Sequence, residues 1–303
     1  MTKAMEQNRV DIVRSIFNGM SEEYDRLTDP WYQYTFGTID QVLINEFALP
    51  AQSSYKPVAL DVGCGTGIQS LRLAALGYRV VGVDIAEKLL TVARTKLMKA
   101  GWSDASLYIA DAQSLPFADS FADCINCCGP TLSFIPNWQR SLAEMARCLK
   151  PGGRLLLEVE GKWNPDLFWE VINALGFNAL RYDESLATAL RHFAPPWSIG
   201  HTMNYPFRLE SGHSVSMPLK LFTANELRDE LEHVNLFQEK GWALHVLTNL
   251  IPSTCLHNPN LSTVLRRLFH VLATVERRVN WFWPFNALGC SILIIARKRQ
   301  VLS

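Results

Sequence analysis

The sequence has no excess of charge of either sign and no long hydrophobic run. Its 29 Lys and Arg residues are balanced by 29 Asp and Glu residues. Such a chain has no broad positive field to attract a polyanion, so we expect no nucleic-acid partner. No apolar stretch approaches the ~20 residues that a membrane-spanning helix needs. The polar start MTKAMEQNR lacks the apolar core of a signal peptide. These absences predict a soluble, cytoplasmic protein.

The cysteines are too few and too scattered for a secreted disulfide scaffold. There are 7, an odd number, spread from Cys64 to Cys290 without framework spacing. Cys124 and Cys127 have the spacing of half a zinc site, but a second pair and a nearby histidine are missing, and the segment has the pattern of a buried strand. We therefore expect a reducing compartment, a packing role for these two side chains and no bound metal.

What the sequence does contain is an alternation of strand and helix patterns. Buried-strand patterns occupy 58–63, 78–84, 106–112, 122–128 and 154–160, with helical patterns at 68–76, 87–100 and 138–149 between them. This alternation predicts an α/β fold with a mostly parallel sheet. A length of 303 residues suits one such core with an elaborated cover.

Four segments are predicted along the chain. Residues 1–57 form a helical lid, because apolar residues from Val10 to Met20 share one helix face. Residues 58–160 form the core, and 161–222 form an inserted substrate cover whose many aromatic side chains either line an apolar pocket or fill a core beneath an extra layer. Residues 223–303 complete the sheet, with a helix opened by Thr223 and Glu226 at capping-box spacing, a strand at about 242–250, a helix at 261–279 and a strand at 289–296.

A glycine-rich loop directly follows the first strand and precedes a helix. Gly63, Gly65 and Gly67 in DVGCGTG permit a tight turn and a close approach of the backbone to a nucleotide-like ligand. In the dinucleotide motif the third glycine comes one residue later, where this chain has Ile68. Asp61, just before the turn, would repel a pyrophosphate but attract the ammonium group of S-adenosylmethionine (SAM). Spacing and charge both favour SAM over a nicotinamide dinucleotide.

Two further carboxylates stand at the ends of the next strands. Asp84 closes the second strand, where a carboxylate can accept hydrogen bonds from both hydroxyls of a ribose. Asp111 follows the third strand, in place to meet the edge of an adenine. Each aspartate alone has the alternative of a helix N-cap or a solvated loop. Three of them at successive strand ends indicate a nucleotide site.

Four segments within residues 58–160 resemble the successive motifs of class I SAM-dependent methyltransferases: DVGCGTG, GVDIAEKLL, ADAQSLPFADSFAD and LKPGGRLLLEVE. The resemblance implies a Rossmann-like sheet of seven strands, mostly parallel with the last strand antiparallel, an N-terminal helical lid and an insertion after strand five. It also implies SAM as the co-substrate. The residues that it places at SAM are Asp61, Gly63, Cys64, Gly65, Gly67, Asp84, Ile85, Asp111, Ala112, Cys127 and Cys128.

The N-terminal segment SIFNGMSEEYDRL is similar to the opening of ubiquinone and menaquinone methyltransferases, in which an N-terminal helix covers SAM. This similarity makes Tyr24 a cofactor-binding lid residue. The other motifs of the quinone enzymes are not evident, and the insertion is longer than their core needs.

The acceptor side carries no motif that fixes its chemistry. Methyl transfer from a sulfonium is an in-line displacement on an activated donor, so alignment matters more than a fixed catalytic group. The candidates for a base are Glu158, Glu160, His192, His201, His213 and His245, each histidine having a structural role as the alternative. The Asn-Pro-Pro-Tyr clamp of nucleic-acid amine methyltransferases is absent after strand four.

The sequence therefore predicts a SAM-dependent methyltransferase with a small, lipophilic acceptor such as a quinone, a polyketide or another lipid-like metabolite. The alternatives are a SAM-binding protein with a regulatory, non-catalytic role and a nicotinamide-dependent oxidoreductase. Peripheral contact with a membrane or lipid is a further expectation, because the aromatic segment VNWFWPFNALG adjoins a helix that carries Arg266, Arg267, Arg277 and Arg278. The oligomeric state is not indicated.

Overall fold

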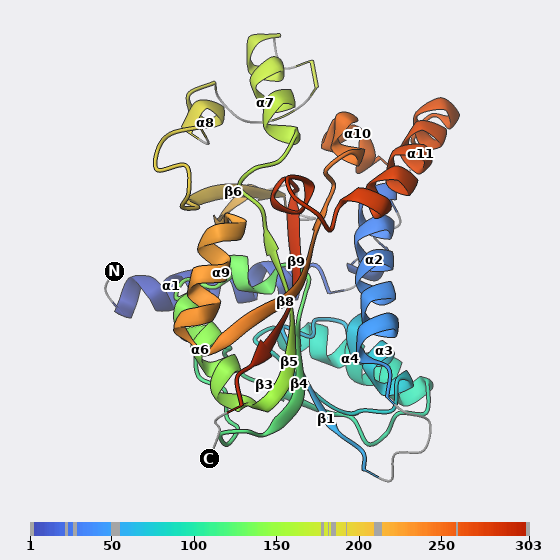
Figure 1. Ribbon diagram of the computed structural model, residues 1–303, viewed down its shortest axis with the longest axis vertical. Helices are drawn as coiled ribbons and strands as arrows, with labels where there is room; N and C mark the ends of the chain where they lie inside the picture. The colour runs from blue at the N-terminus through green and yellow to red at the C-terminus, as the bar shows by residue number, and fades with distance from the viewer. Residues whose placement is uncertain are drawn as a thin grey trace.

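The computed structural model describes residues 3–21, 24–26, 29–49, 55–176, 179–180, 182, 186–191, 193–208, 214–258 and 260–300. Its centre is a seven-stranded sheet in the order β3-β2-β1-β4-β5-β9-β8 (Figure 1). The strands are β1 (Val58–Val62), β2 (Arg79–Asp84), β3 (Ser106–Ile109), β4 (Ala122–Cys127), β5 (Leu149–Glu160), β8 (Leu236–Leu244) and β9 (Ser291–Lys298).

All strands of this sheet except the last run in one direction. β1 pairs in parallel with β2 and β4, β2 with β3, and β4 with β5. β9 is antiparallel to both β5 and β8, so β8 runs with the parallel strands. This arrangement confirms the predicted Rossmann-like sheet with its last strand antiparallel.

The helices of the described residues are α1 (Lys3–Gly19), α2 (Pro30–Phe47), α3 (Ile68–Ala75), α4 (Glu87–Lys99), α5 (Thr131–Phe134), α6 (Trp138–Cys148), α7 (Asp166–Leu175), α8 (Leu186–Arg191), α9 (Ala224–His233), α10 (Ser253–Leu256) and α11 (Thr263–Val279). Three short 3-10 helices are η1 (Tyr24–Arg26), η2 (Thr248–Leu250) and η3 (Phe285–Ala287). Within this described part of the chain, no helix combines the length and the hydropathy needed to cross a membrane.

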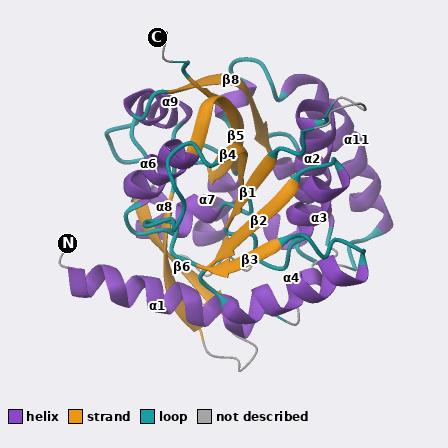
Figure 2. Ribbon diagram, turned by 90° about the horizontal axis from the view of Figure 1, so that it is seen from below, coloured by secondary structure: helices purple, strands orange, loops and turns teal. Residues whose placement is uncertain are grey.

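Helices cover both faces of the sheet because its central strands are buried on both sides. In β9, Ile292 and Ile294 face one layer, whereas Leu293 and Ile295 face the other. The first layer contains α6 and α9, and the second contains α2, α3 and α11 (Figure 2). The continuous apolar run of the last strand is thus explained by two-sided burial.

The strand that precedes α11 lies earlier than its sequence pattern predicted. The pattern placed it at about 242–250, but β8 ends at Leu244. His245 leaves the strand with a φ of 60°. The carboxylate of Glu276 in α11 then accepts the backbone N–H groups of His245, Leu247 and Thr248. Of the apolar residues after Leu244, Val246 is therefore buried in a loop, and Leu250 ends the 3-10 helix at Thr248–Leu250.

The start of α9 follows the predicted capping box in part. The Oγ1 atom of Thr223 accepts the N–H of Glu226 at 3.2 Å. The Glu226 carboxylate does not complete the box, because it accepts hydrogen bonds from Lys220 Nζ at 2.6 Å and from the N–H of Gly200 at 2.8 Å. The cap thereby joins α9 to the end of the insertion.

The insertion contains more regular structure than its sequence indicated. It holds α7, α8 and a hairpin of β6 (Thr202–Arg208) and β7 (Ser214–Lys220). Met217 of β7 packs with Val13 and Ile16 of α1. The hairpin thus packs against α1 through Met217.

Candidate active site

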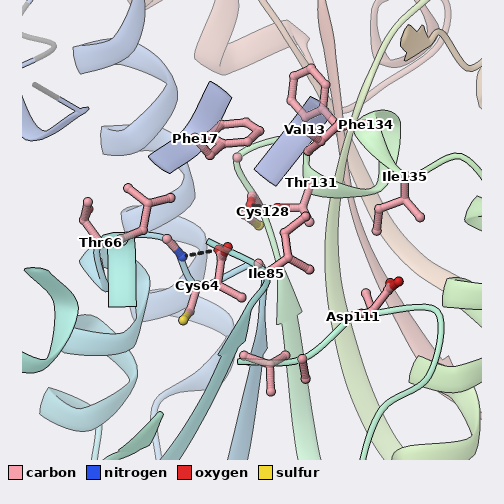
Figure 3. Close-up of a pocket in the computed structure, with 18 of the residues that line it drawn as sticks. Val13, Phe17, Cys64, Thr66, Ile85, Asp111, Cys128, Thr131, Phe134 and Ile135 are labelled. Atoms are coloured by element: carbon pink, nitrogen blue, oxygen red, sulfur yellow. Dashed lines mark hydrogen bonds between the residues drawn. The ribbon is translucent and has the colours of Figure 1, made fainter. Parts of the chain in front are cut away.

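A pocket that opens to solvent lies where the parallel strands end. The strand order reverses here, since β2 and β3 lie on one side of β1 while β4 and β5 lie on the other. Such a switch point leaves a crevice at the carboxyl ends of an open α/β sheet. The segments that leave β1, β2, β3 and β4 line one part of the pocket, and α1 lines another (Figure 3).

The loop from β1 to α3 brings backbone atoms to the pocket. Gly63 has a φ of 69°, and a Cβ there would lie 2.4 Å from the Thr131 side chain, so glycine is required. Gly65 has a φ of 52°, and a Cβ there would meet no atom within 4 Å, because it faces open space. The N–H groups of Gly63 and Cys64 donate to the carbonyl oxygen of Val83. The loop is therefore fixed against β2 with its backbone open to a ligand.

Asp61 lies beneath this loop and does not line the pocket. Its buried carboxylate accepts hydrogen bonds from Ser70 Oγ of α3 at 2.5 Å and from Asn126 Nδ2 of β4 at 2.7 Å. Burial raises the pKa of Asp61 to about 6, against the effect of these two bonds. Asp61 therefore acts on the site through the loop that it anchors.

Asp84 lines the pocket at the end of β2. Its Oδ2 atom accepts the N–H of Gly65 at 2.9 Å, and its Oδ1 atom accepts the N–H of Ala86 at 2.8 Å. Burial raises the pKa of this carboxyl above its ordinary value. A carboxylate oxygen can accept more than one hydrogen bond. Asp84 can thus hold the loop and still accept hydrogen bonds from a ligand.

Asp111 and Gln113 form the next part of the wall, after β3. The Asp111 carboxylate accepts the backbone N–H of Gln113 at 2.9 Å, and Gln113 Nε2 donates to both of its oxygens at 3.2 and 3.0 Å. Gln113 Oε1 is buried and has no hydrogen-bond partner among the described residues. The sequence analysis did not identify Gln113, because its importance depends on this contact with Asp111. This oxygen is an acceptor that the described residues leave unsatisfied, buried within the wall of the pocket.

Opposite these polar groups the pocket wall is apolar. Val13 and Phe17 of α1 lie on the same side of the pocket as Phe134 and Ile135 (Figure 3). The rings of Phe17 and Phe134 meet edge to face with their centroids 5.7 Å apart. The periodicity of α1 predicted an apolar face, but no pattern in 131–136 assigned that short segment to a pocket.

The 3-10 helix η1, which follows α1, is held against the core by the side chain of Asp25. Asp25 accepts a hydrogen bond from Thr66 Oγ1 at 2.7 Å and pairs with Lys96 Nζ of α4 at 2.7 Å. Tyr24 lines the pocket, and burial, followed by the negative charge of Glu158, raises the pKa of its phenol. The phenol therefore stays protonated and can donate a hydrogen bond.

The remaining residues predicted at SAM divide into two groups. Those that line the pocket are Cys64, Ile85, Ala112 and Cys128. Gly67 does not line it and stands instead at the N-cap of α3. Cys127 ends β4 and points into the layer that contains α6, because side chains of a strand alternate between the two faces.

The two glutamates at the end of β5 do not line the pocket. Glu158 is fully buried, and its Oε2 atom accepts the N–H of Gly129, a pocket residue, at 2.7 Å. Burial raises the pKa of Glu158, and burial together with the charge of Glu158 raises the pKa of Glu160 to about 8. At neutral pH Glu160 is therefore mostly protonated, which makes it a poor base there.

No histidine of the described residues lines the pocket. The ring of His245 stacks on Trp31 at a centroid distance of 3.6 Å, and its nitrogens contact Thr35 Oγ1 at 2.8 Å and Thr248 Oγ1 at 3.0 Å. Burial lowers the pKa of His245 well below its ordinary value, so it is a neutral core residue. His201 precedes β6, and His192 and His213 lie outside the described residues.

The described residues of the insertion do not line the pocket either. Phe222 packs in the core against Trp138 with ring centroids 4.9 Å apart, whereas Phe168 and Trp197 are exposed. Phe177 and the side chains of Tyr205 and Phe207 lie outside the described residues. The described part of the insertion thus contributes support for α1, while α1 and 131–136 form the apolar wall.

The segments that follow β1, β2, β3 and β4 at this pocket lie in a region that matches a family of known proteins. Residues 60–157 match the family model of a methyltransferase domain. The match runs from β1 into β5 and includes the glycine loop, Asp84 and Asp111. This match assigns residues 60–157 to a methyltransferase domain. The predicted family of this region is thereby confirmed.

A curated relative of the methyltransferase domain is the demethylmenaquinone methyltransferase of Shouchella clausii. It is 30% identical to this chain over 155 residues, which are 50% of this chain and 64% of the relative. The chain therefore spans less than two thirds of that relative's length.

Two solved structures share the fold of the chain beyond the methyltransferase domain. A SAM-dependent methyltransferase of Methanosarcina mazei is 22% identical, with a TM-score of 0.52, and the match covers 85% of this chain and 98% of that one. The 1,6-didemethyltoxoflavin-N1-methyltransferase of Burkholderia thailandensis, solved with 1,6-didemethyltoxoflavin and S-adenosylhomocysteine, is 14% identical, with a TM-score of 0.54 and coverage of 97% and 91%. At these identities the similarity shows the fold.

The two bonds of Asp25 predict how strongly the amide hydrogens of α1 are protected from exchange. Asp25→Ala removes the bonds to Thr66 and Lys96, so amide hydrogens of residues 3–19 should exchange at least about tenfold faster, as expected for the loss of charge-assisted bonds. Hydrogen-exchange mass spectrometry measures this. Asp11→Ala is the matched control, since Asp11 pairs with Arg14 on the exposed surface of the same helix. Equal exchange in both variants would show that η1 does not hold α1.

The raised pKa of Glu160 predicts a pH-dependent stability difference. A carboxyl whose pKa is raised from 4.5 to about 8 on folding stabilises the fold below pH 4.5 and loses this contribution as the pH rises through 8. Glu160→Gln keeps the neutral form, so its free energy of unfolding should rise relative to the parent between these two pH values. Urea denaturation across that range, with the exposed Glu232→Gln as control, measures the difference. A parallel pH profile for parent and Glu160→Gln would contradict the assignment.

Proposed function

We propose that this protein transfers a methyl group from SAM to a small apolar acceptor that binds between α1 and residues 131–136. The observation that carries the proposal is the division of one pocket into a polar half, built by the segments that follow β1, β2 and β3, and an apolar half, built by α1 and residues 131–136. A donor with a charged, hydroxyl-rich body fits the first half. An acceptor without charge fits the second.

The polar half fits SAM in its shape and in its hydrogen-bonding groups. The backbone of Gly65 faces open space where a side chain would intrude, and Gln113 Oε1 is a buried acceptor without a partner among the described residues. We assign Asp84 to the ribose hydroxyls, and Asp111, Ala112 and Gln113 to the adenine. Bound SAM supplies a methyl group on a positively charged sulfur, which is already activated for displacement.

The chain's own residues align the acceptor and keep water out. Phe17 and Phe134 close the apolar side with an edge-to-face contact, and an acceptor packed against this wall loses its freedom to rotate away from the donor. The protonated phenol of Tyr24 can donate a hydrogen bond to an oxygen of the acceptor.

The proposed acceptor class rests on the apolar wall and agrees with the relative that is named for demethylmenaquinone. A quinone or a comparable ring compound with an apolar tail has the polarity that this wall selects. A nucleotide or a polar amine would leave its charged or hydrogen-bonding groups unpaired against Val13 and Phe134.

The predicted domain organisation becomes part of the same proposal. Residues 1–57 act as the lid, 58–160 bind SAM, 161–222 cover and support the lid, and 223–303 complete the sheet. The free cysteines of the described residues suit a reducing compartment, so we propose action on the cytoplasmic side. The proposed partner is a small-molecule substrate.

Asp84→Ala tests the assignment of the polar half. Loss of the carboxylate removes the ribose acceptors and the bond to Gly65, so the affinity for SAM should fall by about 2–4 kcal/mol. Isothermal titration calorimetry with SAM and with NADH measures this and separates the nicotinamide alternative. Asp119→Ala is the control, because Asp119 is exposed outside the pocket. Unchanged SAM binding in Asp84→Ala would reject the ribose assignment.

Phe134→Ala tests the apolar half. Removing most of a buried phenyl contact should raise the acceptor KM about tenfold or more, while the Kd for SAM stays the same. Prenylated quinones and polyketides, added with S-adenosylhomocysteine, should raise the Tm of the parent but not of Phe134→Ala. Phe168→Ala, at an exposed phenylalanine of α7, is the control. Stabilisation and methylation only with polar metabolites or RNA would refute the proposed acceptor class, and SAM binding without any methylation would favour the regulatory alternative.

A further inference from the structure

Helix α11 exposes an apolar stripe on the side opposite its core contacts. Its buried side places Phe269 and Ala273 against the layer that contains α2. The exposed side carries apolar residues at successive spacings of four, three and four, which share one helix face. This α11 stripe consists of Val264, Leu268, Val271 and Val275, which are 76%, 45%, 60% and 43% exposed. A continuous apolar row of this kind marks a contact surface.

Only positive charge borders the α11 stripe on its own helix. Arg267 and Arg278 are exposed and lie three residues after Val264 and Val275, so each stands one turn along the same side. The acidic residue of α11, Glu276, is fully buried and bonded to backbone N–H groups. The whole chain has equal numbers of acidic and basic residues. The basic character is therefore local to this helix.

Aromatic residues suited to a membrane interface directly follow α11. Trp281 and Trp283 are 59% and 80% exposed. Tryptophan is enriched at membrane–water interfaces, where its ring meets lipid headgroups and the upper acyl chains. Figure 1 shows α11 at the same end of the molecule as α7 and α10.

We infer that α11 docks this protein on an anionic membrane surface, with the stripe in the lipid interface and Arg267 and Arg278 at the headgroups. An amphipathic helix with apolar and basic faces binds such a surface through both contributions. A second copy of the chain is a poorer occupant, because two paired α11 helices would oppose arginines without an exposed acid on either helix. The inference does not depend on methyl transfer, and its test needs neither SAM nor an acceptor.

The test is flotation of the full-length protein with vesicles of phosphatidylcholine alone or mixed with phosphatidylglycerol. The protein should bind the anionic vesicles at least about tenfold more tightly than the neutral ones, and about 0.5 M NaCl should weaken this binding, because salt screens exposed charges. Arg267→Glu/Arg278→Glu should reduce binding to anionic vesicles at least about tenfold. Val264→Ser/Val271→Ser should also reduce it, because it removes apolar surface from the stripe.

Matched controls come from exposed residues of α4 and β3. Arg94→Glu/Lys99→Glu changes the charge equally, and Met98→Ser/Ile109→Ser removes apolar side chains of similar exposure, 65% and 59%. Both controls should bind anionic vesicles like the parent. Equal losses in controls and α11 variants, or no vesicle binding by the parent, would overturn the inference. A dimer in light scattering that Val264→Ser/Val271→Ser converts to a monomer would also overturn it, since the stripe would then bind a second copy.

Discussion

The turn from β1 into α3 is the constraint on which the site depends, and two carboxylates hold it. Asp61 ties the first turn of α3 to β4 through Ser70 and Asn126, and it is buried where water cannot compete for these bonds. Asp84 ties the middle of the loop to β2 through the N–H of Gly65. Since both anchors stand at the same edge of a parallel sheet, the loop is set before a ligand arrives. The polar half of the pocket is built on this fixed loop and on the segments that follow β2 and β3.

The apolar half depends in part on segments outside the methyltransferase domain, although its residues 131–136 lie within that domain. Asp25 latches η1 to Thr66 and Lys96, and β7 supports α1 from behind through Met217. The apolar side of the pocket is therefore assembled from α1 and residues 131–136, and the described part of the insertion packs against α1 without lining the pocket. Such a division lets the donor site stay constant while the acceptor wall changes, which suits a fold that serves many substrates.

The sequence predicted the features that rest on local patterns. Two-sided burial makes the strands at 58–62 and 291–298 rich in apolar residues, and glycines at positive φ mark the loop at Gly63 and Gly65. Features that depend on distant contacts could not be predicted. Asp61 looks like a ligand residue until Ser70 and Asn126 are seen to enclose it. Gln113 gains its role from Asp111. The edge strand β8 contains the polar residues Gln238, Glu239 and Lys240, so its pattern does not indicate a strand there, and the apolar residues after Trp242 led the prediction to place the strand too late.

The central claim is that the two halves of one pocket bring SAM to a small apolar acceptor. Its most direct test is incubation of the purified protein with SAM labelled in the methyl group and with an organic-solvent extract of lipophilic metabolites. The account predicts that the label enters a small molecule that partitions into the organic phase, at a rate that depends on the protein. Label that stays with SAM, or that enters only protein, RNA or water-soluble metabolites, would contradict it.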